Sequence, residues 1–195
     1  DGIRDVERSR GLGDVYKRQV ILMPKNTNNI FLIGPMGSGK TSVAKRLSAK
    51  LSKEFIDTDL KISNITGVDI NYIFDIEGEA GFRKREEATL KACVLENNII
   101  LSTGGGIVLS RNNRHLLKTH GVVIYLETNI DSQESRTSLT NKRPLLKNTE
   151  HKKTLQELML TRGPLYEEIA DITINTDNKS PNKVATEAHS KINEY

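Results

Sequence analysis

The segment GPMGSGKT, residues 34–41, constrains what this chain can fold into more than any other feature. It matches every position of the P-loop pattern, and it lies between an apolar strand pattern and an amphipathic helical pattern, which is the context that the pattern requires. Its glycines allow backbone N–H groups to converge on phosphate oxygens, and the N-terminus of the following helix adds positive potential. The sequence therefore predicts a phosphate site in which Lys40 reaches the β- and γ-phosphates and the Thr41 hydroxyl ligates Mg²⁺.

Strand and helix patterns alternate along the rest of the chain. The strand patterns are short apolar runs, as in buried parallel strands, and helical segments separate them. This alternation predicts an α/β fold with a parallel sheet that is covered on both faces. The expected strands are residues 30–34, 54–57, 99–103, 122–127 and 172–176.

Composition narrows the classes of protein that need to be considered. A length of 195 residues fits one domain, and Cys93, the single cysteine, excludes an intrachain disulfide framework and a cysteine-based zinc site. No apolar run approaches the length of a membrane span and no secretion signal is visible, so we expect a cytoplasmic protein with no membrane partner. A net charge of +4 suits anionic ligands but is weak support for nucleic acid, so we expect no nucleic acid partner.

The first 22 residues differ from the rest of the chain. They are rich in charge and glycine, and they have no convincing apolar period. We therefore expect residues 1–22 to be a disordered or artefactual tail and residues 23–195 to form a single domain.

Two short matches to guanine-nucleotide motifs do not make the chain a GTPase. DIEG at residues 75–78 fits D-x-x-G at only two fixed positions. NKRP at residues 141–144 begins like N-K-x-D, but Pro144 stands where the carboxylate should be. A GTP-dependent switch is therefore disfavoured.

Asp57 and Asp59 stand at the end of the second expected strand, in the segment FIDTDL. Alternate residues of an extended segment point the same way, so both carboxylates would face the sheet edge where open α/β sheets bind ligands. One of them could help to hold Mg²⁺, and the other could accept a hydrogen bond from an acceptor hydroxyl. The alternative is that Asp59 only caps the following helix.

Three successive glycines, Gly104, Gly105 and Gly106, follow the third expected strand. Glycine contributes no side chain to packing and costs backbone entropy, so three of them at the end of a core strand need a reason. They indicate that something comes very close to the backbone at this point.

Two arginines stand close together in the segment GFRKREE. Arg83 and Arg85 lie on nearly opposite sides of a helical pattern, so at most one of them can face a given cleft. Glu86 comes three residues after Arg83, where it is a surface neighbour and could orient that arginine.

Arg162 falls on the apolar stripe of the helical pattern at residues 154–170. Pro164 removes a helical hydrogen bond there and should kink or break the helix. An arginine among apolar neighbours needs an anionic partner, which is either a structural carboxylate such as Asp171 or the carboxylate of a bound substrate.

The segment 141–153 is polar, basic and bounded by helical patterns. It predicts a mobile lid whose Arg143 closes over the transferred phosphate. The alternative is an ordinary surface loop.

The motifs GPMGSGKT, DTD, GFRKRE, TGGG, RPLL and RGPLYEEIAD occur in one order and spacing that closely resembles the shikimate kinase family, over residues 28–195. The resemblance implies that the γ-phosphoryl of ATP is transferred to the 3-hydroxyl of shikimate, with Mg²⁺, in chorismate and aromatic amino acid biosynthesis. It also implies a P-loop kinase fold like that of nucleoside monophosphate kinases: a three-layer sandwich with five parallel strands in the order 2-3-1-4-5. We expect a monomer.

The resemblance further implies roles for individual residues. Lys40, Asp59 and Arg143 would be catalytic, and Thr41 and Asp57 would hold the metal ion. The residues implied for shikimate are Asp59, Arg83, Gly104, Gly105, Gly106 and Arg162. Those implied for the nucleotide are Gly37, Ser38, Gly39, Lys40, Thr41, Ser42, Arg136, Arg143, Lys179 and Pro181.

One position departs from the family pattern, because Lys179 stands near the adenine where relatives often have an arginine. Lysine stacks less well on adenine than arginine does. Two other functions stay open. Another small-metabolite kinase of this fold, such as a gluconate kinase, should not need both arginines around TGGG. A non-catalytic nucleotide sensor would bind ATP without acceptor-dependent release of ADP, or would bind DNA with a steep salt dependence.

Overall fold

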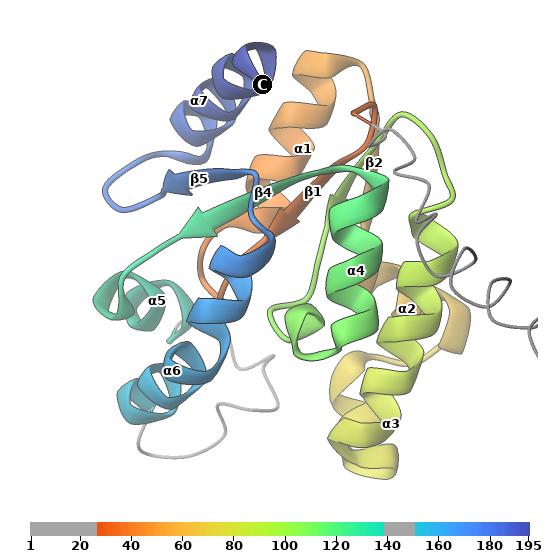
Figure 1. Ribbon diagram of the computed structural model, residues 1–195. Helices are drawn as coiled ribbons and strands as arrows, with labels where there is room; N and C mark the ends of the chain where they lie inside the picture. The colour runs from red at the N-terminus through yellow and green to blue at the C-terminus, as the bar shows by residue number, and fades with distance from the viewer. Residues whose placement is uncertain (1–26, 139–150) are drawn as a thin grey trace, which may run out of the picture.

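The computed structural model describes residues 27–138 and 151–195, and Figure 1 shows how they are arranged. A five-stranded parallel sheet lies at the centre, in the order β2-β3-β1-β4-β5. This is the order that the family resemblance implies, so the expected fold class is confirmed. The strands are β1 (Ile30–Ile33), β2 (Glu54–Asp57), β3 (Ile99–Ser102), β4 (Val122–Glu127) and β5 (Ile172–Asn175).

Helices connect the successive strands and lie on both faces of the sheet (Figure 1). They begin after short polar or glycine-rich turns, and several have a side-chain cap, such as Ser110, which accepts the N–H of Asn113. The helices are α1 (Lys40–Leu51), α2 (Thr58–Thr66), α3 (Ile70–Cys93), the 3₁₀ turn η1 (Ile107–Leu109), α4 (Arg111–His120), α5 (Ile130–Thr137), α6 (His151–Ile169) and α7 (Pro181–Glu194).

The central strand β1 is buried on both faces. Alternate residues of a strand point to opposite sides, so Phe31 and Ile33 pack into the core under α3, α4 and α6. Ile30 and Leu32 pack into the core under α1 and α7. All four side chains are fully buried. The fold is therefore a three-layer sandwich, with a helical layer on each side of the sheet.

Helices α2 and α3 form an arm with a small core of its own, at the lower right of Figure 1. Ile62, Ile73 and Phe82 are buried in this core. The helix α3 is interrupted at Gly78, whose backbone angles are φ 68° and ψ −178°. The arm is thus attached to the sheet at both ends: α2 follows β2 directly, and the second part of α3, after the break, leads to β3.

Three predicted motifs meet at the carboxyl ends of the strands. In the sheet, β1 lies between β3 and β4; the chain runs from β1 to β2 on one side and later crosses from β3 to β4 on the other. Open α/β sheets bind ligands at the carboxyl ends of strands around such a reversal. The P-loop follows β1, the two aspartates follow β2 and the three glycines follow β3. The strand register places Asp57 beside Ser102, and Ser102 beside Leu32.

Helix α6 differs from the expectation in two ways. It begins at His151, inside the segment that we expected to be the lid, and it runs through Pro164 to Ile169 without a break. A proline leaves the carbonyl four residues earlier without a helical donor. That residue is Leu160, which is 79% exposed, so water can satisfy the carbonyl.

Some predictions fall on residues outside the described ranges. The expected tail at residues 1–22, most of the expected lid at 141–153, and Arg143 are among these. Within residues 27–138 and 151–195, none of the helices combines the length and apolar character that crossing a membrane would need.

Candidate active site

The P-loop connects the end of β1 to the start of α1. Gly34, Gly37 and Gly39 have φ angles of 142°, 81° and 87°, which residues with side chains rarely adopt. Helix α1 begins at Lys40 without a side-chain cap, so its first N–H groups suit an anionic ligand. The Lys40 ammonium group donates to the carbonyls of Gly34 and Pro35, both at 2.8 Å, and so lies across the loop.

Side-chain oxygens gather beside the P-loop. Thr41 Oγ1 donates to Asp57 Oδ2 at 2.8 Å and lies 3.2 Å from Ser102 Oγ. The other oxygen of Asp57 accepts the N–H groups of Asp59 and Leu60 and thereby caps α2. The cap of α2 is therefore Asp57 and not Asp59. A carboxylate and two hydroxyls next to a phosphate loop fit Mg²⁺, which takes oxygen ligands and draws several of them from phosphates and water.

The residues Gly104, Gly105 and Gly106 form a loop between β3 and η1, which we call the glycine loop. A Cβ atom on Gly104 would lie 2.7 Å from Glu86 Oε1, and a Cβ atom on Gly106 would overlap the guanidinium group of Arg83. The close approach that the sequence predicts is therefore made by charged side chains of α3 at two of the three positions.

Gly105 has a different environment from the two glycines beside it. A Cβ atom on Gly105 would have no protein neighbour nearer than 3.5 Å, and the nearest atoms are Gly34 O and Met36 N of the P-loop. The middle of the glycine loop thus packs against the phosphate-binding loop. Steric contact with the described protein atoms does not by itself require glycine here.

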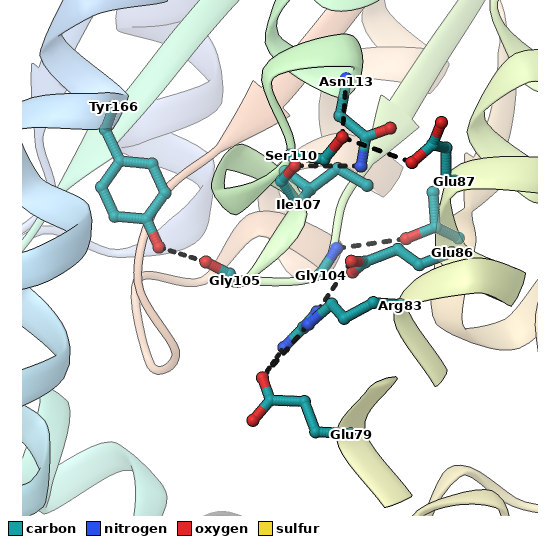
Figure 2. A network of polar contacts seen from close by, with 11 residues as sticks. Glu79, Arg83, Glu86, Glu87, Gly104, Gly105, Ile107, Ser110, Asn113 and Tyr166 are labelled. Atoms are coloured by element: carbon teal, nitrogen blue, oxygen red, sulfur yellow. Dashed lines mark hydrogen bonds and ion pairs between the residues drawn. The ribbon is translucent and has the colours of Figure 1, made fainter. Parts of the chain in front are cut away.

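Arg83 is held on α3 by two carboxylates (Figure 2). Its Nη1 donates to Glu86 at 2.7 Å, and its Nε and Nη2 donate to Glu79 at 3.2 and 2.9 Å. Arg85 instead pairs with Glu77 at 2.5 Å on the exposed side of the arm. Arg83 is therefore the member of the pair that faces the cleft, and Glu86 orients it, as the helical spacing predicts.

The Glu86 side chain is fully buried at the floor of the site. Burial raises the pKa of this carboxyl, although the neighbouring Arg83 acts in the opposite direction. Its Oε2 atom pairs with Arg83, whereas its Oε1 atom has no hydrogen-bond partner among the described residues. A buried polar atom without a partner in the protein is costly unless a ligand or water satisfies it.

Arg162 enters the site from α6 and is only 5% exposed. Asp171, the structural partner that we considered for it, lies at the amino ends of β4 and β5. There it accepts hydrogen bonds from Val123 N at 2.7 Å and from the Tyr195 hydroxyl at 3.1 Å. Arg162 instead lines the cleft, close to the Glu86 carboxyl group and the Tyr166 hydroxyl group. This position in the cleft favours the alternative, in which a bound anion pairs with Arg162.

Arg136 and Lys179 mark the far end of the site. The guanidinium group of Arg136 donates to Gly37 O at 3.1 Å and to Thr176 O at 3.0 Å, so it links the P-loop to the segment after β5. Lys179 Nζ pairs with Glu187 on α7 at 2.7 Å. This pairing draws the ammonium group of Lys179 toward α7.

One cleft of about 670 Å³ connects all of these groups. Every predicted site residue that the structure describes lines it, whereas Arg143 lies outside the described residues. The predicted residues that line the cleft are Gly37, Ser38, Gly39, Lys40, Thr41, Ser42, Asp57, Asp59, Arg83, Gly104, Gly105, Gly106, Arg136, Arg162, Lys179 and Pro181.

Several lining residues were not predicted as site residues. The sequence did indicate Glu86, since its spacing of three residues on a helix places it next to Arg83. The apolar ones follow the same periodicity as other core positions, so the sequence does not distinguish them. The additional lining residues are Met36, Val43, Ile70, Phe74, Phe82, Glu86, Thr103, Thr176 and Val184.

The two ends of the cleft differ in chemistry. One end presents the P-loop with its lysine, and the other presents two arginines, Arg83 and Arg162, beside the glycine loop. A cleft that can hold the phosphates of a nucleotide next to a second anion is what phosphoryl transfer to a small acceptor requires. The fold and the cleft thus define a P-loop kinase that acts on a small anionic molecule.

Comparison with known proteins identifies the family. The family model described as shikimate kinase matches residues 36–193, and the chain belongs to the shikimate kinase family. It is therefore a phosphotransferase, and enzymes of this family use ATP with Mg²⁺.

Individual relatives agree with this assignment. The chain is 52% identical to a shikimate kinase of Actinobacillus pleuropneumoniae over 158 residues, which cover 81% of this chain and 91% of the relative. It is 48% identical to a shikimate kinase of Vibrio cholerae over 167 residues, which cover 86% and 96%.

Solved structures give the same result. Shikimate kinase from Acinetobacter baumannii, in complex with shikimate, is 39% identical, has a TM-score of 0.85 and covers 87% of this chain and 95% of its own. A gluconokinase from Sinorhizobium meliloti covers 87% of this chain and 94% of its own, but it is only 15% identical and has a TM-score of 0.55. The second likeness shows a common fold alone.

Proposed function

We propose that this chain transfers the γ-phosphoryl of ATP to the 3-hydroxyl of shikimate and releases ADP and shikimate 3-phosphate. The observation that carries the proposal is the cleft itself, in which the P-loop and the buried Arg162 line one continuous space. A metabolite carboxylate bound at the arginine end would have its ring between that end and the phosphates. The reaction would serve aromatic biosynthesis in the cytoplasm, and we expect the enzyme to act as a monomer.

The nucleotide end would work through backbone N–H groups and Lys40. The N–H groups at the start of α1 would hold the phosphates. Lys40 would exchange its contacts with the carbonyls of Gly34 and Pro35 for the β- and γ-phosphates, where its charge stabilises the developing negative charge. Arg136, Lys179 and Pro181 would border the adenine.

Thr41 and Asp57 would hold Mg²⁺, since their oxygens lie together beside the P-loop. The metal ion, when bound, would neutralise phosphate charge and orient the γ-phosphoryl group. Asp57 also caps α2, and this second role supports the binding of Mg²⁺. One carboxylate oxygen accepts from the helix, which fixes the direction of the other oxygen toward Thr41.

The acceptor end would bind shikimate through opposite charge. Arg83 and Arg162 would hold its carboxylate, and the glycine loop would lie against it. Asp59, whose Oδ1 would lie 3.1 Å from a Cβ atom on Gly104, would accept a hydrogen bond from the shikimate hydroxyl groups and act as a base. Arg143 would complete the site over the transferred phosphoryl group.

A coupled assay of ADP release tests this function. Shikimate, quinate, gluconate and AMP are offered side by side with ATP and Mg²⁺. We expect turnover with shikimate to exceed turnover with each of the others by at least about 100-fold, because AMP lacks a carboxylate, and quinate and gluconate carry theirs on skeletons of different shape. Equal turnover with gluconate, or ATP binding without any acceptor-dependent release of ADP, would contradict the proposal.

A further inference from the structure

Tyr166, on α6, contacts the glycine loop with its hydroxyl group. The side chain is fully buried, and its ring stacks on that of Tyr125, with 5.2 Å between the ring centroids. The hydroxyl donates a hydrogen bond to the carbonyl of Gly105 (Figure 2). Burial raises the pKa of this phenol above its ordinary value, although the adjacent guanidinium group of Arg162 acts in the opposite direction, so the hydroxyl keeps its proton.

With this hydrogen bond, every carbonyl group of the glycine loop accepts a hydrogen bond. Each of the three carbonyls has a donor, and one of the three N–H groups has an acceptor. The N–H groups of Gly105 and Gly106 have no acceptor among the described residues. The other pairs are Gly104 N–H with Thr58 Oγ1 at 3.1 Å, Ile107 N–H with Gly104 C=O at 3.2 Å, and Leu109 N–H with Gly106 C=O at 3.0 Å.

The carbonyl of Gly105 and the N–H of Gly106 belong to the same peptide group. In a planar trans peptide these two bonds point in opposite directions. Between two glycines, no side chain hinders rotation of the peptide plane. The hydrogen bond from Tyr166 therefore selects one orientation of this plane, in which the N–H of Gly106 points away from Tyr166.

The orientation of this peptide plane matters because Gly106 lies beside Arg83. Gly106 packs directly against the guanidinium group of Arg83, and Tyr166 lies one helical turn after Arg162. We propose that Tyr166 is a positioning residue for the acceptor: its hydroxyl fixes the Gly105–Gly106 peptide so that the Gly106 N–H donates to the carboxylate bound by Arg83 and Arg162. This inference rests on the proposed function, because it takes the ligand at the arginine end to be a carboxylate.

A pair of matched variants tests the inference. Tyr166→Phe removes the hydroxyl and keeps the ring stack. Tyr125→Phe removes a hydroxyl from the other ring of the same stack, and that hydroxyl has no hydrogen-bond partner among the described residues. KM for shikimate, KM for ATP, kcat and the melting temperature are measured for both variants and for the wild type.

We expect Tyr166→Phe to raise KM for shikimate roughly five- to tenfold, the loss expected for one hydrogen bond, with kcat and KM for ATP changed by less than about twofold. Tyr125→Phe should leave all three constants within about twofold of the wild type. A role in stability alone would lower the melting temperature without this selective change. If Tyr166→Phe behaves like Tyr125→Phe, or if it weakens ATP and shikimate equally, the inference is wrong.

The activity of the wild type on shikimate distinguishes a failure of this inference from a failure of the proposed function. A wild-type protein without activity on shikimate overturns the proposed function and the inference together. An active wild type with an unaffected Tyr166→Phe variant overturns the inference alone.

A measurement on the wild type tests the Gly106 contact that the inference requires, and it does not depend on the folding of Tyr166→Phe. In protein labelled with ¹⁵N-glycine, the amide proton of Gly106 should shift downfield when shikimate is added. It should not shift with an analogue that lacks the carboxylate. An amide resonance of Gly106 that is unchanged by saturating shikimate overturns the inference.

Discussion

Buried charges set the chemistry of the cleft at the scale of single residues. Glu86 is fully buried and Arg162 nearly so, although charged side chains are rarely buried unless they are paired. Glu86 has Arg83 as a partner on one of its two oxygens, and Arg162 faces the cleft. A bound anion can pair with Arg162, whereas the Glu86 oxygen that has no partner among the described residues needs a hydrogen-bond donor.

Arg162→Lys tests whether Arg162 binds the carboxylate of the acceptor. Lysine keeps the charge but loses the planar group that makes two parallel hydrogen bonds. We expect a loss of about 1–3 kcal/mol in shikimate binding, measured as kcat/KM for shikimate, with a much smaller change in ATP affinity. Arg111→Lys, at an exposed position on α4, is the matched control and should have no effect.

An analogue of shikimate without the carboxylate completes this test. It should be a poor substrate for the wild type and should lose little more in Arg162→Lys, because the two interacting groups have then both been changed. If Arg162→Lys impairs the analogue as much as shikimate, Arg162 has a structural role and the assignment of the acceptor site is wrong.

The raised pKa of Glu86 predicts how stability depends on pH. The unfolded chain loses this proton at a lower pH than the folded protein does. Stability from this group is therefore full below the pKa of the unfolded chain and is lost as pH rises through the folded pKa. Glu86→Gln cannot ionise, so its free energy of unfolding relative to the wild type should rise as the pH increases from below the unfolded pKa to above the folded pKa, measured by urea unfolding.

Glu87 provides a control on the same helix. Hydrogen bonds from Asn112 and other neighbours lower the pKa of the Glu87 carboxyl, so its contribution has the opposite sign. Stability from Glu87 is present above the pKa of the unfolded chain and is lost as pH falls. Glu87→Gln should therefore become less stable relative to the wild type as pH rises. The same direction in both variants would show that burial does not govern Glu86.

At the scale of elements, the break in α3 is the feature that places Arg83. Gly78 interrupts the helix, and Glu79 and Arg83 both follow it. The ion pair between Glu77 and Arg85 spans the break from the exposed side. The second part of α3 is thereby free to take a direction of its own and to bring Arg83 to the glycine loop.

Gly78→Ala tests this feature by straining the backbone alone. A φ of 68° with a ψ of −178° is a conformation that only glycine adopts readily, and a Cβ atom would meet no neighbour within 4 Å. We expect a loss of up to about 3 kcal/mol in the free energy of unfolding. Gly67→Ala, with φ 72° and ψ 6° and equally open surroundings, should cost only about 1 kcal/mol. Equal losses in urea unfolding would contradict this account.

Most elements could be predicted because their signals are local. The apolar runs give the strands, and the glycines and lysine of the P-loop give the first turn and helix. Two points that the sequence left open depend on the environment. A break at Pro164 was one of two expected outcomes, and α6 has none there, since Leu160 is exposed to water. The cap of α2 is Asp57, because the extended end of β2 continues up to that residue.

At the scale of the whole molecule, the site could be predicted only in part. Motif residues lie next to each other in the sequence, so the P-loop, the aspartates and the glycine loop were each recognisable. Contacts between distant segments were not. The hydrogen bond from Tyr166 to Gly105 joins residues 61 positions apart, and that between Thr58 and Gly104 joins residues 46 positions apart. Such contacts depend on the topology of the sheet and leave no local pattern.

Deletion of residues 1–22 tests the prediction that the domain comprises residues 23–195. The segment has no apolar face to bury, so we expect the melting temperature and kcat/KM to stay almost unchanged. Thermal unfolding of both forms is the measurement. A melting temperature several degrees lower in the shortened chain would show that the tail packs on the domain.

The continuity of the cleft has a consequence for the design of inhibitors. A compound that joins adenosine to a cyclohexene carboxylate through a phosphate chain would occupy both ends of the same space. The second binding event would then be intramolecular, at an effective concentration in the millimolar range, and could raise affinity by about 10²- to 10⁴-fold without any new contact. The gain would vanish for tethers too short to reach from the P-loop to Arg162, so the shortest effective tether would measure the separation of the two anion sites in this cleft.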